Sequence, residues 1–306
     1  MTRSLTSFVV RRVAAALLFV AVVSAGALVL ARVVPGDATT ALRMSGADEA
    51  TIEAARQRLG LNRSAGEHLR DWATGLVTLD LGRSSLYNQP VSALVLDRAR
   101  HTAWLAALAL LLATAIGLPL GILTGSRRRG VVRALVGTVS TALVACPPII
   151  GVLALLWLAV TTGWLPDTPG SILLPTLALA LPLAATIERL QSQATAEALG
   201  AVDLTAAAAR GVPPSRLVWI HAARQSLRPV LGVYGLIIAT LFSGSLAVEM
   251  MTSWPGLGRL TYEALTHRDL FLVAGCALAG ATFIAAGNLI ADVLRAVLDP
   301  RVREEA

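Results

Sequence analysis

The sequence contains no lysine, only two cysteines and few aromatic residues, and these scarcities exclude several classes of protein. All 26 basic residues are arginine, so the chain lacks the phosphate-binding loop G-x-x-x-x-G-K-S/T and cannot hydrolyse ATP by that route. Aromatic residues make up 5% of the chain. The arginines lie between apolar runs rather than in one basic patch, so the net charge of +7 does not indicate nucleic-acid binding.

The cysteines and histidines do not form a recognisable metal or redox motif. Cys146 and Cys276 both lie inside apolar runs and are interpreted as small buried hydrophobic residues. The four histidines have no metal-ligand spacing: His68, His101, His221 and His267. The sequence therefore predicts neither a metal nor a cofactor in this chain.

Charged residues are also scarce, at 15% of the 306 residues, whereas 55% are hydrophobic and the mean hydropathy is +0.68. Such a composition is typical of a membrane protein. Six apolar runs are long enough to cross a bilayer, which takes about 20 helical residues; they cover approximately 8–34, 101–125, 134–160, 171–190, 229–250 and 271–298. The first run follows two arginines, as a signal peptide would, but its length and the later runs favour an uncleaved first helix.

Arginines are distributed unequally across the predicted loops, and this asymmetry predicts orientation. The segments predicted to be cytoplasmic contain Arg3, Arg11, Arg12, Arg127, Arg128, Arg129, Arg133, Arg210, Arg216, Arg224, Arg228, Arg301 and Arg303. The short loops on the opposite side contain only Arg259 and Arg268, each near an acidic residue. Both termini are therefore predicted to be cytoplasmic.

The region 35–100 is long, mixed in charge and predicted to be external. A short helix is expected over 48–60, with Ile52, Ala55 and Leu59 on one face. Ser64 and Glu67 have the spacing of a capping box ahead of Leu69, Trp72 and Leu76, and they predict a second helix. The two helices form either a lid or platform on the outer face or a plain tether between the first two spans.

The segment 191–228 contains four arginines, which at about 3 kcal/mol each would cost about 12 kcal/mol at the bilayer centre. We therefore expect a cytoplasmic hairpin rather than another span. Its pattern predicts a small-residue helix over 205–210, a break at 211–214 and a second helix capped by Ser215. Leu217, Ile220 and Leu227 are expected on one face of the second helix, and Pro229 in the first turn of the fifth span.

A helix built of alanines has little side-chain bulk and can lie close to a groove on another protein. The alternative is a solvated connector, which would not require so many small apolar residues beside a bend.

The hairpin residues resemble a known family. Ala206, Ala207 and Gly211 have the spacing of the EAA signature of ABC importer permeases, with Thr205 in place of the glutamate. His221, Ala222, Arg224, Leu227 and Pro229 resemble the permease family for oligopeptides, dipeptides and nickel, in its first-subunit branch.

The resemblance extends in order along nearly the whole chain. Its further landmarks are Pro35-Gly36-Asp37, Arg58-Leu59-Gly60-Leu61, Asp80-Leu81-Gly82-Arg83-Ser84, Glu249, Ser253-Trp254-Pro255-Gly256-Leu257-Gly258, Asn288, Asp292 and Leu298-Asp299-Pro300-Arg301. The chain departs from the family at Ser192, Thr205 and Ala208, where charge is lost, and at Leu79, where glycine is commoner.

This resemblance implies an all-α polytopic membrane protein with six transmembrane helices and the type I ABC importer permease fold. It implies residues 1–34 as the N-terminal region and first helix, 35–100 as the external region, and 101–306 as a five-helix core with a coupling loop at about 191–228. The implied function is that of a non-catalytic permease subunit that translocates dipeptides or short oligopeptides, while nickel chelates, glutathione and other small solutes remain open.

The resemblance also implies partners and site residues. The partners are a second homologous permease subunit, two ATPase subunits that bind ATP and magnesium, and an external binding protein, at a bacterial or archaeal cytoplasmic membrane. Coupling to the ATPase is assigned to Ala206, Ala207, Gly211, Pro214, His221, Arg224, Leu227 and Pro229. A translocation gate is assigned to Glu249, Trp254, Pro255, Gly256 and Gly258.

Two other classes of membrane protein are alternatives to an importer permease. A transporter driven by an ion gradient would use acids within the membrane, and Glu188, Glu249 and Asp292 are the candidates. Each is predicted near a span end, where an interfacial charge is the simpler interpretation, and Arg295 is the expected partner of Asp292. An intramembrane hydrolase is not favoured, because no histidine within a span could serve the serines at 243–245.

Overall fold

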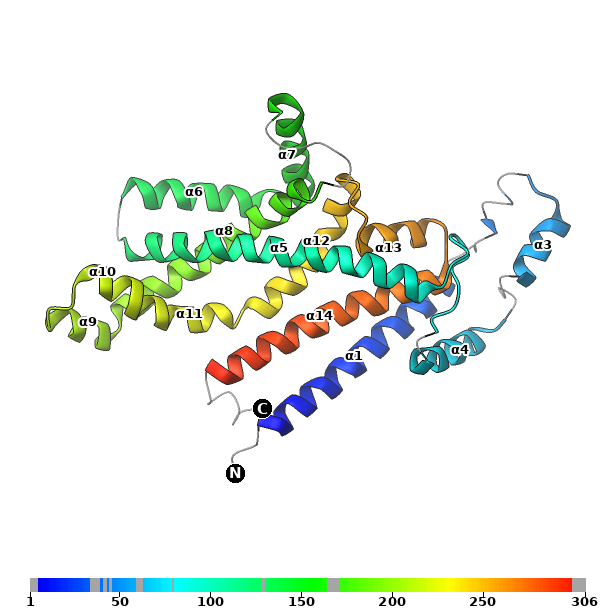
Figure 1. Ribbon diagram of the computed structural model, residues 1–306, viewed down its shortest axis with the longest axis horizontal. Coiled ribbons are helices and arrows are strands. Elements are labelled where there is room, and N and C mark those ends of the chain that lie inside the picture. The colour runs from blue at the N-terminus through cyan, green and yellow to red at the C-terminus, as the bar shows by residue number, and fades with distance from the viewer. Residues whose placement is uncertain are drawn as a thin grey trace. The chain divides into compact units, whose positions relative to one another are not determined.

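The computed structural model describes residues 5–33, 39–40, 43, 46–58, 63–78, 80–127, 130–163 and 171–298. The described part of the chain is helical and contains no strand; a single isolated antiparallel bridge joins Arg83 and Pro90 (Figure 1). Several residues of the sequence analysis lie outside the described residues: Arg3, Pro35-Gly36-Asp37, Leu59-Gly60-Leu61, Leu79, Arg128, Arg129, Asp299-Pro300-Arg301 and Arg303.

The helices follow one another in a simple order. They are α1 (Leu5–Val33), α3 (Glu49–Arg58), α4 (Ala65–Thr78), α5 (Val91–Ser126), α6 (Val131–Ala145), α7 (Pro148–Thr162), α8 (Leu173–Gly200), α9 (Val202–Ala209), α10 (Pro214–Arg216), the π-helix η1 (Leu217–Ala222), α11 (Ala223–Leu231), α12 (Tyr234–Met251), α13 (Leu257–Thr266) and α14 (Leu270–Leu298).

Five helices are individually long and apolar enough to cross a membrane: α1, α5, α8, α12 and α14. The pair α6 and α7 also passes this test when taken together, which raises the number of candidate spans to six. The two helices meet at an angle of 111°. The third span, predicted over 134–160, is sharply bent where its two prolines lie: Pro147 adopts an extended conformation and Pro148 starts a new helix, because proline cannot continue the backbone bonding of the helix before it.

The ends of other spans also differ from those predicted from hydropathy. Helix α5 begins at Val91 rather than near 101, and α8 continues to Gly200 rather than ending near 190. The fifth span begins at Tyr234 rather than at 229. Hydropathy locates the apolar part of a helix, whereas backbone bonding continues into polar flanks that an apolar window does not detect.

The chain divides into two compact units, and the first contains residues 1–13, 104–254 and 286–306. Its apolar core is formed mainly by α5, α8 and α12 and includes Leu105, Ala109, Ala113, Ala180, Ile187, Ile237 and Val248. Three glycines on α5 allow the backbones of α5 and α8 to approach closely. A Cβ atom at Gly121 would lie 2.5 Å from Cβ of Gln191, and one at Gly125 would lie 2.3 Å from the carbonyl oxygen of Ser192.

The second unit contains residues 14–103 and 255–285. It includes α3 and α4, so the prediction of two short helices in this region is confirmed. The side chains of Ile52 and Trp72 are buried, with 1% and 2% exposed, whereas Leu69 is 37% exposed.

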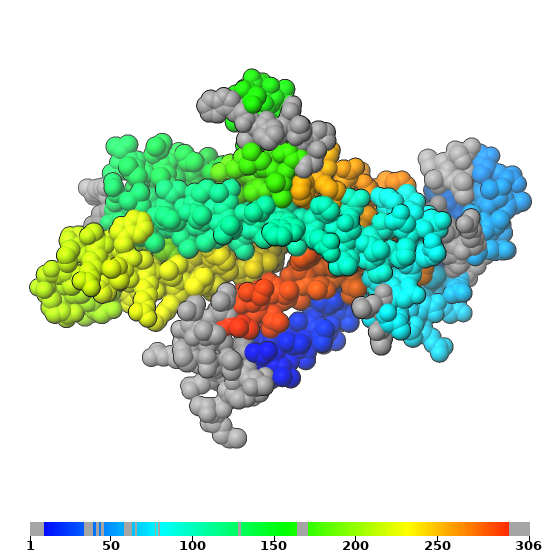
Figure 2. Space-filling view, viewed as in Figure 1, coloured from blue at the N-terminus to red at the C-terminus, as the bar shows by residue number. Residues whose placement is uncertain are grey.

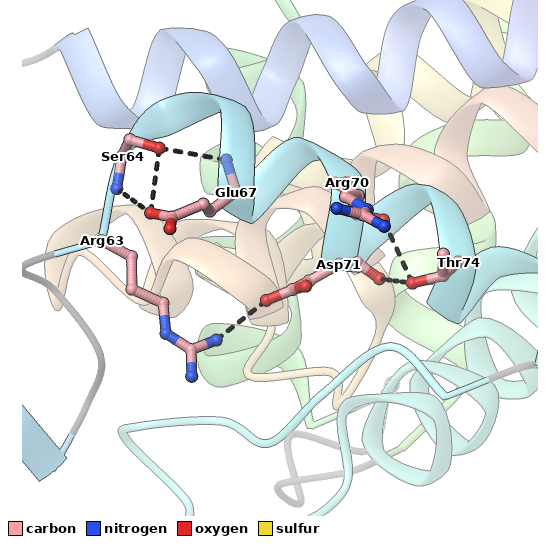
Figure 3. A network of polar contacts seen from close by, with 6 residues as sticks. All are labelled: Arg63, Ser64, Glu67, Arg70, Asp71 and Thr74. Carbon is pink, nitrogen blue, oxygen red and sulfur yellow. Dashed lines mark hydrogen bonds and ion pairs between the residues drawn. The ribbon is translucent and has the colours of Figure 1, made fainter.

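The predicted capping box at the start of α4 is also confirmed (Figure 3). The Glu67 carboxylate accepts hydrogen bonds from the Ser64 backbone N–H at 2.7 Å and from its hydroxyl at 2.9 Å. In return, the Glu67 backbone N–H donates to Oγ of Ser64 at 3.3 Å. The two bonds that the carboxylate accepts from the Ser64 backbone and hydroxyl lower the pKa of Glu67 below its ordinary value, because both favour the charged form.

Candidate functional site

The hairpin between α8 and α12 begins with α9, whose end is set by Gly211. This glycine has a φ of +86°, a conformation that an L side chain rarely adopts. The N–H groups of Gly211 and Val212 bond to the carbonyl oxygens of Ala208 and Ala207 at 3.0 and 3.3 Å. Helix α9 therefore ends with a left-handed glycine, which is a common way to terminate a helix.

The second helix of the hairpin, α10, is not capped by Ser215 as predicted. Pro213 is the N-cap of α10, Pro214 occupies its first turn, and no side chain donates or accepts a capping bond. Ser215 is thus inside α10 rather than its cap. Proline suits this position because its ring presets φ and its missing N–H would have no partner in the first turn.

The π-helix η1 changes which residues face inward in the part of the hairpin that follows the break. Leu217 packs against Ala198, Leu204 and Ala222, as an inward residue should. Ile220, however, is 55% exposed whereas Leu217 and Leu227 are half-buried, so the prediction that the three share one face is wrong. A π-helix bonds residue i to residue i+5 and so places more residues in each turn than the α-helix assumed from the sequence. Pro229 lies inside α11 rather than in the first turn of the fifth span.

Most of the residues assigned to coupling are accessible on this hairpin. Gly211, Pro214, His221, Arg224 and Pro229 are exposed, whereas Ala206, Ala207 and Leu227 are half-buried.

Three large apolar side chains outside the residues assigned to coupling are also exposed on the hairpin: Val202 at 85%, Trp219 at 50% and Ile220 at 55%. Exposed arginines lie beside them in sequence, including Arg210, Arg216 and Arg224. Figure 2 shows the hairpin as an accessible surface in yellow-green.

The base of the hairpin contains a buried polar cluster. The Gln191 side-chain amide on α8 donates to Oγ of Ser226 on α11 at 2.7 Å and to Oγ1 of Thr195 at 3.0 Å. The Thr195 hydroxyl donates to Oγ of Ser226 at 3.3 Å. These three residues were not selected from the sequence, because isolated polar residues so far apart carry no motif.

Glu188 also lies inside the first unit rather than near a helix end. Its carboxylate accepts a hydrogen bond from the Thr124 hydroxyl at 2.6 Å, and only 3% of the residue is exposed. Glu188 is therefore buried against α5, and α8 continues well beyond it; its position near the end of a span stays a prediction. Asp292 forms an ion pair with Arg12 at 3.1 Å; the side chain of its expected partner, Arg295, lies outside the described residues.

The segment assigned to the gate starts at the end of α12. Glu249 is completely buried, and its carbonyl oxygen accepts a hydrogen bond from the backbone N–H of Trp254 at 3.0 Å. Ser253 has a φ of +56°, which turns the chain away from the helix axis. Glu249 and Trp254 are thus brought into one turn, and the side chain of Trp254 is mostly buried.

The remaining gate residues, Pro255, Gly256 and Gly258, lie at the start of α13. Gly256 is the N-cap, and the backbone N–H of Leu257 donates to Oγ1 of Thr102 at 2.7 Å.

A second polar cluster in the second unit attaches the loop before α5 to the start of α14. The carboxylate of Asp269, which is 1% exposed, accepts hydrogen bonds from the Ser84 hydroxyl at 2.6 Å and from the N–H of Leu86 at 3.0 Å. It also caps α14 by accepting from the N–H of Leu272 at 3.1 Å. The sequence marked Ser84 as a family landmark but gave no sign of its partner.

Beside this cluster, the Tyr87 hydroxyl donates to the Glu263 carboxylate, which also binds Arg259 at 3.0 Å. Burial raises the pKa of Tyr87 to about 12, and the hydrogen bond to Glu263 and the charge of that carboxylate act in the same direction. Burial alone would raise the pKa of Glu263, but the bonds from Tyr87 and Arg259 and the arginine's charge lower it overall.

No group of three or more histidine, cysteine, aspartate or glutamate side chains that could hold a metal ion occurs in the described ranges. The fold and the hairpin define a class: a polytopic helical membrane protein that exposes an apolar and arginine-containing hairpin outside its long apolar helices.

Comparison with known proteins gives the family. Residues 117–304 match the family described as "Binding-protein-dependent transport system inner membrane component". The chain belongs to this family and is a non-catalytic, membrane-embedded permease subunit of an ATP-binding-cassette importer.

Similar proteins cover nearly the whole chain. A putative peptide transport system permease protein of Brucella abortus (strain 2308) is 34% identical over 98% of this chain and 99% of its own length. The oligopeptide transport system permease protein AppB of Bacillus subtilis (strain 168) is 27% identical over 97% of this chain and 99% of its own. A glutathione transport system permease protein of Pectobacterium atrosepticum is 31% identical over 88% of this chain and 90% of its own.

Proposed function

We propose that this permease imports dipeptides or short oligopeptides across a bacterial or archaeal cytoplasmic membrane, with both of its termini in the cytoplasm. The relatives carry the names of peptide, oligopeptide and glutathione permeases, and glutathione is itself a short peptide. The complete importer contains a second homologous permease, two ATPase subunits that bind ATP and magnesium, and an external binding protein. The arginine asymmetry across the loops supports the orientation.

The observation that carries the coupling role is the exposed surface of the hairpin. Val202, Trp219 and Ile220 remain at least half exposed although they are large and apolar. Solvent-exposed apolar groups of this size, interspersed with arginine, are typical of a surface that binds another protein. We assign this surface to the ATPase subunit, which must contact the permease outside the membrane.

Gly211 provides the sharpest test, because its small size is not needed for packing within this chain. A Cβ atom at this position would meet nothing within 4 Å. Gly46 in the region between α1 and α3 is a matched control, since its φ of +79° is close to the +86° of Gly211 and its Cβ would also meet nothing. Arginine at either glycine therefore introduces a similar backbone strain and a similar bulk.

We expect Gly211→Arg to reduce recovery of the ATPase subunits on purification and to reduce ATP-driven peptide uptake in the reconstituted complex. Gly46→Arg should leave both at the level of the unmodified protein. Normal recovery and normal uptake with Gly211→Arg would contradict the coupling role and would leave the hairpin as a connector.

We further propose that the external binding protein, rather than this chain, selects the peptide. The test is to replace the binding protein by one that still docks but captures a different class of peptide, and to measure which class is imported. The imported class should change with the binding protein. If selectivity instead stays with the permease, the spans contain a binding site that determines it.

A further inference from the structure

The cluster of Gln191, Thr195 and Ser226 joins the two helices that lead into and out of the hairpin. Gln191 and Thr195 are one turn apart on α8, before the hairpin, and Ser226 is on α11, after it. Gln191 and Thr195 have no exposed surface, and Ser226 is 1% exposed. In Figure 1 the helices α8 and α11 both lead to the hairpin formed by α9 and α10.

The donors of this cluster are used consistently, whereas the Gln191 side-chain oxygen is buried and accepts no hydrogen bond from the described residues. The two hydrogens of the Gln191 amide go to Thr195 and Ser226, the Thr195 hydroxyl donates to Ser226, and the Ser226 hydroxyl donates to the carbonyl oxygen of Ala223. Each hydrogen is therefore used once, which matches the capacity of an amide and two hydroxyls. The three side chains form a closed ring of hydrogen bonds between two helices.

Apolar side chains would hold these helices together without the cost of burying polar groups. Hydrogen bonds add directionality, because they weaken steeply when the distance or the angle changes. The ring therefore favours one register of α11 along α8 more sharply than an apolar contact would.

The ring is also fixed on its other side. A Cβ atom at Gly121 of α5 would lie 2.5 Å from Cβ of Gln191, and one at Gly125 would lie 2.8 Å from Cβ of Thr195. The turn of α8 that carries the ring is therefore in close contact with α5 and cannot rotate without separating the two helices. Ser226 thus attaches α11, which follows the hairpin, to the closely packed helices α5 and α8.

We infer that Gln191, Thr195 and Ser226 are positioning residues that lock α11 onto α8, so that a displacement of the hairpin moves α8 and its partner α5 with it. This inference rests on the proposed coupling role of the hairpin. Without the ring, α11 can shift along α8, and part of the hairpin's movement is lost before it reaches the long helices.

The test separates positioning from simple packing. Gln191→Leu, Thr195→Val and Ser226→Ala together replace the ring with apolar side chains of similar size, and removing all partners at once leaves none of the three hydrogen-bonding groups buried without a partner. We would measure peptide uptake and ATP hydrolysis in the reconstituted importer with its binding protein. The expected result is normal recovery of the ATPase subunits and normal ATP hydrolysis, with uptake per ATP reduced about fivefold or more.

An unchanged ratio of uptake to ATP hydrolysis in the triple variant would overturn the inference. If the triple variant does not assemble, a matched pair at one position decides the question. Thr195→Val removes the hydroxyl but keeps the branched shape, whereas Thr195→Ser keeps the hydroxyl. A lower ratio with valine but not with serine supports the ring, and equal ratios overturn it.

These outcomes can be told apart from failure of the proposed function. If Gly211→Arg abolishes uptake while the triple variant keeps a normal ratio, the coupling role stands and the positioning role falls. If the unmodified complex shows no uptake driven by ATP, the proposed function itself is contradicted, and the inference falls with it.

Discussion

At the residue scale, Gly121 determines how closely α5 and α8 pack. Alanine at this position would place its Cβ 2.5 Å from Cβ of Gln191 and 2.7 Å from the carbonyl oxygen of Glu188. We expect Gly121→Ala to destabilise the protein by about 1–3 kcal/mol, because the helices must separate to admit the methyl group. Thermal unfolding of the detergent-purified protein would measure the change.

The matched control for this substitution is Gly137→Ala in α6, where a Cβ atom would meet nothing within 4 Å. This control should be neutral or slightly stabilising, since alanine favours a helix more than glycine does. Equal unfolding temperatures for the two variants would show that the close packing of α5 on α8 is not present in the protein.

Asp269 is a second residue on which several backbone and side-chain groups depend. Asp269→Ala leaves the Ser84 hydroxyl and the N–H groups of Leu86 and Leu272 without their acceptor. We expect a loss of about 2–3 kcal/mol in the free energy of unfolding, because hydrogen bonds to a buried charge are among the strong ones. Limited proteolysis of the loop at 83–89 should accelerate in parallel.

Asp97→Ala is the control for Asp269→Ala, since the Asp97 side chain is 62% exposed and lies 4.0 Å from Arg98. Such an exposed pair contributes little to stability. Proteolysis as fast in the Asp97 variant as in the Asp269 variant would contradict the role of Asp269.

The contact between Tyr87 and Glu263 predicts a dependence on pH. The folded pKa of Glu263 lies below its ordinary value of 4.5, so its contribution to stability is complete above 4.5 and is lost as the pH falls through the folded pKa. The folded pKa of Tyr87 is raised from 10.0 to about 12, so its contribution is complete below 10.0 and is lost as the pH rises through about 12.

We therefore expect Tyr87→Phe to lower the unfolding temperature between these limits and to have a smaller effect as the pH falls below 4.5. Unfolding curves of both proteins over this range would measure the difference. A difference that stays constant down to strongly acidic pH would contradict the assignment.

At the scale of elements, the start of α4 depends on its capping box (Figure 3). Ser64→Ala removes the hydroxyl that bonds both the carboxylate and the backbone N–H of Glu67. We expect the first turn of α4 to fray, with faster amide hydrogen exchange at Glu67 and His68. The second half of the helix should exchange as before.

The control for Ser64→Ala lies on the same helix. The Thr74 hydroxyl bonds only to the carbonyl oxygens of Arg70 and Asp71, which are already engaged in the helix. Thr74→Ala should therefore leave exchange unchanged or slower, because alanine is the better helix former. Fraying in both variants, or in neither, would show that the capping box does not hold the first turn.

Local chemistry explains which elements the sequence could predict. Ser64 with Glu67 specified the start of α4, and Gly211 specified the end of α9, because each signal acts within a few residues of itself. The bend at Pro147 and Pro148 was visible as two prolines, but its angle depends on packing around α6 and α7. The π-helix at 217–222 has no sequence signal of its own, so the face on which Ile220 lies was predicted wrongly.

The candidate site also combines residues that the sequence could identify with residues that it could not. The bend of the hairpin at Gly211 could be predicted, because the break and the neighbouring small residues are contiguous in sequence, whereas the exposure of Val202 and Trp219 could not. Gln191 and Ser226 could not, since they are polar residues on different helices whose partnership exists only in the folded chain. The burial of Glu188 against Thr124 could not be predicted either, because the apolar run ends near Glu188 whereas the helix continues to Gly200.

At the scale of the whole molecule, the arginine asymmetry predicts which surfaces face the cytoplasm. Single cysteines can be introduced after Cys146 and Cys276 are replaced. A membrane-impermeant thiol reagent added to intact cells should label cysteine at Asp48 or Thr266 but not at Ser215. All three positions should react once the membrane is permeabilised, which controls for accessibility. Labelling of Ser215 from outside would contradict both the orientation and the docking of a cytoplasmic ATPase.

The ion pair between Arg12 and Asp292 links a residue near the beginning of the chain to one near its end, at 3.1 Å. Helix α1 precedes α14 in the sequence, so during synthesis Arg12 emerges well before the carboxylate that pairs with it. A nascent chain that stops before α14 can insert its earlier helices but cannot form this contact. A truncation before α14 therefore removes the carboxylate of this ion pair while it leaves Arg12 in place.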